Sequence, residues 1–150
     1  MRTPEELARL ELLVELDDRV CRRVQTDGYP SLTVHERTVH CVWWLEVEVN
    51  NGGFDQYFFN SAGDHALDAV AALKRIGASS AAAILRRAIA VFEPETPSED
   101  RFVRQAQLAK LTDTQLELLN TLDDEFYAYP DDIEGLLEAY VRTHAASFLN

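Results

Sequence analysis

The chain has 150 residues, of which 47% are hydrophobic, and its 26 acidic residues against 14 basic ones give a net charge of −12. This length and apolar content are typical of a folded domain and exclude an intrinsically disordered chain. The negative charge repels phosphate, so direct binding to nucleic acid or to an anionic membrane is disfavoured, whereas a basic protein is a favoured partner. We expect a monomer or a homodimer.

The two cysteines, Cys21 and Cys41, form no CxxC motif and are not accompanied by a matching pair of histidines. This pattern predicts no disulfide framework and no zinc site, and it is typical of buried free thiols in a reducing cytoplasm. The N-terminus has no apolar segment of the signal-peptide type, and no apolar run reaches the roughly 18 residues of a membrane span. We therefore expect a cytoplasmic protein.

Helix signals run through almost the whole chain. Thr3, Thr33 and Thr112 each stand three residues before a Glu or Gln, as in capping boxes. Other apolar runs follow further candidate N-caps: Asp64, Ser79 or Ser80, and Thr96 before Pro97. The expected helices cover residues 3–27, 33–49, 54–58, 64–76, 79–92, 96–111, 112–126 and 133–141. The sequence thus predicts an all-α fold, one compact domain over 1–150 with seven to eight short helices and a possible subdomain break at 93–97.

One segment is ambiguous between helix and strand. Residues 45–49 alternate between apolar and acidic side chains, and Asn51–Gly52 is a dipeptide typical of hairpin turns. However, Asn and Gly also end helices, and an isolated two-stranded hairpin would be only marginally stable. Phe54, Tyr57 and Phe58, at i, i+3 and i+4, also suit a short helix. We predict a helix here, with a β-hairpin as the alternative.

Signs of catalysis are weak. His35 and His40 are five residues apart, about 140° around a helix, so they do not form the i, i+4 pair of a zinc protease. No nucleophile elbow and no glycine-rich phosphate loop is present. We predict no metal, no cofactor and, on balance, no enzymatic activity.

The richest stretch runs from residue 50 to residue 64. It combines glycines, which permit unusual backbone angles, with aromatic side chains and with amides at i and i+4. One interpretation is a polar pocket for a small ligand, or a catalytic pocket, around Gln56, Tyr57, Asn60 and Asp64. The other is a structural corner in which the amides satisfy exposed backbone groups. The residues that define this motif are Asn51, Gly52, Gly53, Phe54, Gln56, Tyr57, Asn60, Gly63 and Asp64.

This motif resembles the signature of the DNA mimic protein family, a bacterial family formerly of unknown function. Residues 71–78 and 122–127 are similar to it as well, so the likeness covers roughly residues 30 to 145. The resemblance implies an all-α domain. For the described member, it also implies an acidic surface that competes with DNA for a transcription factor.

The acidic residues are concentrated near the C-terminus. Nine acids and no base lie between residues 113 and 138: Asp113, Glu117, Asp123, Asp124, Glu125, Asp131, Asp132, Glu134 and Glu138. If this segment were wholly helical, it would carry one charge per about 4.3 Å. A single DNA strand carries one per about 3.4 Å and a duplex one per about 1.7 Å. A second acidic ridge, from 93–100 or from the first helix, or a dimer would be needed to match a duplex.

These observations favour a non-enzymatic protein whose acidic C-terminal third binds a basic protein, such as a transcription factor or another DNA-binding regulator. The alternatives are the small-ligand or catalytic pocket and a partner that binds through apolar surface.

Overall fold

The chain is built from helices whose first turns are held by side-chain caps. The computed structural model describes residues 1–148 and contains no strand within them. Its elements are α1 (Pro4–Asp27), η1 (Tyr29–Ser31), α2 (Val34–Phe59), η2 (Ser61–His65), α3 (Ala66–Arg75), α4 (Ser79–Ala90), α5 (Arg101–Ala109), α6 (Asp113–Tyr127), α7 (Ile133–Thr143) and η3 (Ala145–Phe148). The capping boxes at Thr3, Thr33 and Thr112 are all formed. The all-α prediction is confirmed.

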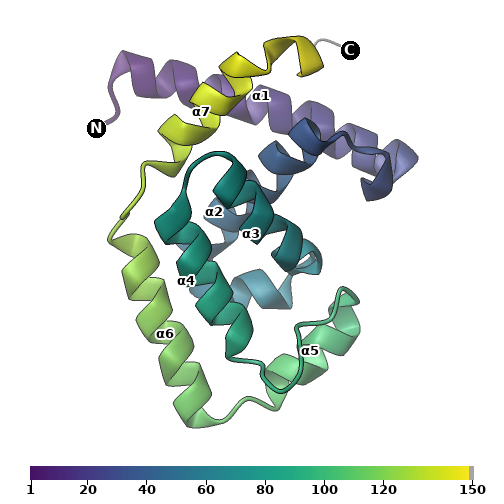
Figure 1. Cartoon of the computed structure of the whole chain (residues 1–150), viewed down its shortest axis with the longest axis vertical. Helices are drawn as coiled ribbons and strands as arrows, with labels where there is room; N and C mark the ends of the chain where they lie inside the picture. Colours follow the sequence, from purple (N-terminus) through teal and green to yellow (C-terminus); the bar gives the residue numbers. More distant parts are fainter. Residues whose placement is uncertain (149–150) are drawn as a thin grey trace.

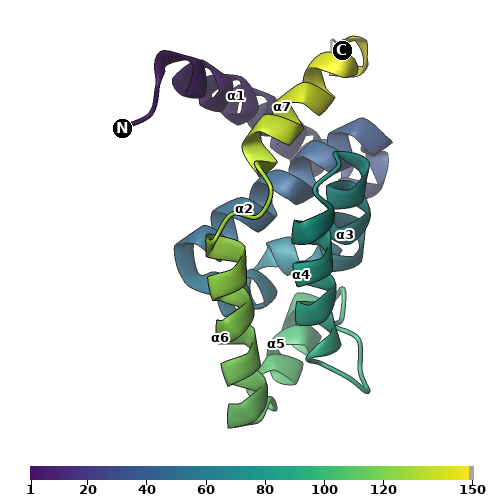
Figure 2. The same cartoon turned by 60° about the vertical axis from the view of Figure 1, so that its left-hand side comes forward.

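Helix α2 runs through the middle of the molecule, with α1 and α7 at one end and α5 and α6 at the other (Figures 1 and 2). It contacts α1, α3, α5, α6 and α7. Its buried apolar side chains belong to one cluster that includes residues from all seven α-helices. Within residues 1–148, no helix is both long and apolar enough to span a bilayer.

Several boundaries differ from the expectation. Residues 45–49 are helical, as predicted, but α2 continues through a kink to Phe59. Asp64 does not cap α3, which follows a 3₁₀ turn and has His65 at its N-cap position without a side-chain bond. Thr96 does not cap α5 either, because Asp100 accepts the Val103 N–H instead.

A buried guanidinium fastens the end of α2. Arg104 on α5 is fully buried and donates to the carbonyl oxygens of Phe58, Ser98 and Asn60 at 2.6, 2.7 and 2.8 Å. It also donates to the Asp64 carboxylate at 2.8 Å. Carbonyls at a helix C-terminus have no partner within the helix, so one side chain satisfies groups that would otherwise be buried and unbonded.

Arg104→Met should therefore lower the free energy of unfolding by about 3 kcal/mol or more, because it leaves buried acceptors and a carboxylate without their donor. Urea denaturation measures this change. The matched control is Arg101→Met, since Arg101 bonds the same end of α2 from an exposed position. Equal losses in the two variants would contradict the role given to Arg104.

A second buried ionisable group joins α2 to the segment before α7. Glu46 is 6% exposed and accepts a 2.9 Å hydrogen bond from the Tyr129 hydroxyl. The pKa of Glu46 is raised to about 7, mainly by burial and to a smaller extent by the nearby carboxylates of Glu134 and Asp132, against the opposing effect of the Tyr129 bond. The folded protein therefore holds a proton on Glu46 that the unfolded chain releases at lower pH.

Stability should consequently fall as pH rises from about 4.5 to 7, because the native state binds more protons than the unfolded state in this window. This rise in the pKa of Glu46 from 4.5 to about 7 corresponds to about 3 kcal/mol of folding stability. Glu46→Gln should flatten the dependence of the unfolding free energy on pH between about 4.5 and 7. An unchanged slope in that variant would assign the pH dependence to other groups.

Candidate functional site

The glycine motif produces the break in α2. Gly52 and Gly53 have non-helical backbone angles, and Gly53 has φ of +77°. The helical hydrogen-bond ladder is interrupted there, so the second part of α2 begins with unsatisfied N–H groups. Asp123 of α6 supplies a partner, accepting the Phe54 N–H at 2.8 Å. The corner is thus capped by a side chain that lies 69 residues further along the chain.

Only glycine fits at position 53. A Cβ atom there would lie 2.3 Å from the Asp123 Oδ2 atom, in addition to the strain of a positive φ. Asp123 is partly buried by this contact, and its desolvation raises the pKa of the carboxyl group even though the Phe54 hydrogen bond lowers it. Asp123 therefore belongs to the corner as much as to the acidic surface.

The amides of the motif converge on one carboxylate. Glu48 is 9% exposed and accepts from Gln56 Nε2 at 2.7 Å and from Asn60 Nδ2 at 3.0 Å. Asn51 Nδ2 donates to Gln56 Oε1 at 3.2 Å. Tyr57 is 1% exposed and packs in the core. The amides are therefore occupied by contacts within the corner, whereas the buried Tyr57 hydroxyl has no hydrogen-bond partner within residues 1–148.

The end of the motif is held by close packing. A Cβ atom on Gly63 would lie 2.7 Å from the Tyr57 carbonyl oxygen and 2.9 Å from Arg104 Nε. Asp64 accepts from Arg104, as described above. Position 63 therefore requires glycine because η2 approaches both the α2 backbone and the buried guanidinium.

Six of the nine C-terminal acids take part in contacts within the chain. Asp123 caps the corner, Asp131 accepts the Ala81 N–H of α4 at 2.8 Å, and Asp132 caps α7. The other three form ion pairs: Glu125 with Arg87, Glu134 with Arg2, and Glu138 with both Arg9 and Arg142. Pairing with arginine cancels much of the local negative potential, and the acids of α7 join that helix to α1.

The other three acids lie on one exposed stripe of α6. Within residues 1–148, the carboxylates of Asp113, Glu117 and Asp124 have no hydrogen-bond or ion-pair partner, and all three residues are exposed. Their spacing places them within an arc of roughly 40° along about 16 Å of helix. Exposed Asp55, on α2, lies near the Asp124 end of this stripe, because its negative charge, like that of Asp124, raises the pKa of Asp123. We call Asp55, Asp113, Glu117 and Asp124 the α6 patch.

The structure thus divides the predicted acidic ridge into two regions. Helices α6 and α7 lie in opposite halves of the molecule (Figure 1), and the paired acids of α7 face α1. Of the arginines that pair with them, Arg2 and Arg9 come from the other end of the sequence and Arg142 lies just beyond the acidic segment, so a count of acids and bases within residues 113–138 does not reveal the pairing.

His35 and His40, which are five residues apart in sequence, have different neighbours in the structure. His35 stacks on His144 and hydrogen-bonds Tyr140, so it is half-buried rather than a free surface residue. His40 instead lies beside two side chains of α1, Asp17 and Cys21, that no local sequence spacing connects with it.

Comparison with known proteins identifies the family. A family profile described as DMP19-like protein matches residues 30–144, which include the whole corner, Arg104 and the α6 patch. Comparisons with curated proteins and with solved structures gave no match. The match covers most of the chain and agrees with the range expected from the motif, and the chain belongs to the DMP19-like protein family.

Proposed function

We propose that this protein binds a basic surface of a DNA-binding regulator in place of DNA, and that the α6 patch makes the contact. The observation that supports this best is the stripe of unpaired carboxylates on a helix that contains no Lys or Arg. Family membership is consistent with it, because the motif resembles that of DNA mimic proteins.

Electrostatics gives the mechanism. Carboxylates that already have arginine partners offer little to a new cation, whereas those of the α6 patch are hydrated and can replace phosphates at Arg and Lys side chains. The net charge of −12 attracts a basic protein from a distance and accelerates encounter at low salt. Asp113 and Glu117, one helical turn apart, are separated by about 6 Å along the axis, which is comparable with neighbouring phosphates.

The patch alone has fewer charges per unit length than DNA. Three carboxylates over about 16 Å of α6 fall below the density of even a single strand. A regulator would therefore be held by a few well-placed contacts plus the long-range field, or by two patches in a dimer. The ligand pocket considered for the corner has less support, because Gln56, Asn60 and Asp64 are bonded within the chain.

The test compares two triple variants that remove the same charge. Asp113→Asn/Glu117→Gln/Asp124→Asn neutralises the three acids of the α6 patch that lie on α6 itself, and Glu11→Gln/Glu15→Gln/Asp18→Asn neutralises three exposed acids on one face of α1. A basic regulator is first selected by its retention on the immobilised wild-type chain. Each variant then competes with a fluorescent operator duplex for that regulator, at low and at high salt.

We expect the α6 variant to compete at least about 100-fold less well at low salt, because three charged contacts are lost, and the α1 variant to stay within about threefold of wild type. Competition by the wild type should weaken steeply with salt. Equal effects of the two variants, or displacement that is indifferent to salt, would contradict the proposal.

A further inference from the structure

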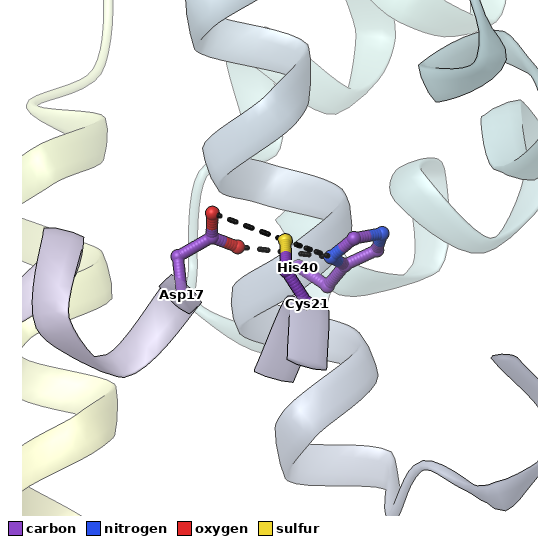
Figure 3. Close-up of side chains that lie close together, drawn as sticks. All are labelled: Asp17, Cys21 and His40. Carbon is purple, nitrogen blue, oxygen red and sulfur yellow. Dashed lines mark hydrogen bonds and ion pairs between the residues drawn. The ribbon is translucent and has the colours of Figure 1, made fainter. Parts of the chain in front are cut away.

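Three side chains with metal-binding atoms meet between α1 and α2. Asp17 and Cys21 lie one turn apart on the same face of α1, and His40 faces them from α2 (Figure 3). Cys21 Sγ is 3.5 Å from Asp17 Oδ2 and 4.0 Å from His40 Nδ1. His40 Nδ1 is 3.6 Å from Asp17 Oδ1.

These separations are close to those between ligands of one tetrahedral zinc ion. Bond lengths of about 2.0 to 2.3 Å and tetrahedral angles put sulfur, nitrogen and oxygen ligands about 3.3 to 3.6 Å apart. Two of the three observed distances fall in or at this range, with Cys21 near one oxygen of the Asp17 carboxylate and His40 near the other, and the Cys21–His40 distance exceeds it by a few tenths of an ångström. A small side-chain adjustment would bring all three atoms onto one ion.

The arrangement differs from a catalytic relay. In a nucleophile–His–Asp triad, one ring nitrogen faces the nucleophile and the other faces the carboxylate. Here the same atom, His40 Nδ1, lies near both Cys21 and Asp17. The three groups therefore converge on a point instead of forming a chain for proton transfer.

The buried carboxylate supplies an independent indication. Asp17 is only 3% exposed, and its Oδ1 atom makes no hydrogen bond within residues 1–148. Within residues 1–148, the polar side chains paired with this carboxylate are the Cys21 thiol, which is a weak donor, and the His40 imidazole. A buried carboxylate without a strong donor or cation is costly, and a bound divalent cation would compensate its charge.

The cluster is also accessible. Cys21 and His40 line a cleft of about 280 Å³, together with Trp44, Glu48, Asp64 and His65. An ion held by the three side chains would therefore have its fourth position toward the cleft, where water or a small anion fits. Three protein ligands with one open position are typical of zinc sites that bind or activate a small molecule.

We propose that Asp17, Cys21 and His40 form a divalent transition-metal site, with zinc as the metal that suits their oxygen, sulfur and nitrogen ligands best. The metal displaces the Cys21 thiol proton, which passes to solvent, and the resulting thiolate is the ligand. This departs from the expectation of no metal site, which rested on the pattern of Cys21 and Cys41 and on the spacing of His35 and His40. It is independent of the proposed role of the α6 patch.

Cobalt(II) provides a direct readout of the site. Titration of the wild-type protein with Co²⁺ should give a saturable thiolate-to-cobalt charge-transfer band in the near ultraviolet and the visible bands of tetrahedral cobalt, at one ion per chain. Zn²⁺ should displace these bands, and it should raise the melting temperature of the wild-type protein.

The matched variants separate the two thiols. Cys21→Ala should abolish the charge-transfer band, whereas Cys41→Ala, which removes the other free cysteine, should retain it. His40→Gln should weaken Co²⁺ binding at least about 100-fold, as expected for loss of a ligand. Far-ultraviolet circular dichroism checks that each variant is folded, and only folded variants are compared. Three outcomes would overturn the proposal: absence of the band in the wild type, persistence of the band in Cys21→Ala, or loss of the band in folded Cys41→Ala. Each would leave an ordinary His–Asp ion pair at this position.

Discussion

The hydrogen bond from the Phe54 N–H to Asp123 organises much of this molecule. It spans the break in α2 and is the point at which α6 is attached to the corner. The same contact brings Phe54 against Phe126, and the two aromatic rings meet edge to face with their centroids 5.9 Å apart. With Leu119 and Leu122 also buried, one face of α6 is committed to the core, and the opposite face carries the carboxylates of the α6 patch. The glycine motif thus sets the orientation of the surface that we propose as functional.

Net charge alone is a poor guide to where this protein presents negative potential. Most of the acids in the C-terminal third are caps or arginine partners, so they contribute mainly to helix ends and to the contact of α7 with α1. The distinction matters for DNA mimicry, which depends on carboxylates that a partner can reach and that no arginine already neutralises. On this criterion α6, with three exposed carboxylates that no arginine pairs within residues 1–148, differs from α7, whose acids Glu134 and Glu138 both have arginine partners.

The features that are local in sequence could be predicted, and those that join distant segments could not. The boxes at Thr3, Thr33 and Thr112 depend on residues three positions apart, and the structure confirms them. The caps supplied by Asp123, on α6, and by Asp131, in the connection between α6 and α7, come from segments distant in sequence, so no spacing rule reveals them. Asp64 and Thr96 have the right residue types for caps, but Asp64 bonds Arg104 and Asp100 takes the role expected of Thr96.

The candidate metal site was missed for the same reason. His40 was compared with His35, its neighbour in sequence, whereas its partners lie on α1. The sequence feature that points to this site is Asp17 itself, a carboxylate four residues before Cys21 and close to the apolar residues Leu16 and Val20.

The most direct test of this account is a double-mutant cycle between Gly53 and Asp123, with unfolding free energies measured by urea denaturation. Gly53→Ala displaces the Asp123 carboxylate in addition to straining the backbone, so it should cost less once Asp123→Ala has removed that carboxylate. The account predicts that the double variant loses about 1 kcal/mol less unfolding free energy than the two single variants lose together. As a control, Asp124→Ala alone should stay within about 0.5 kcal/mol of wild type. Additive effects, or equal costs for Asp123→Ala and Asp124→Ala, would contradict it.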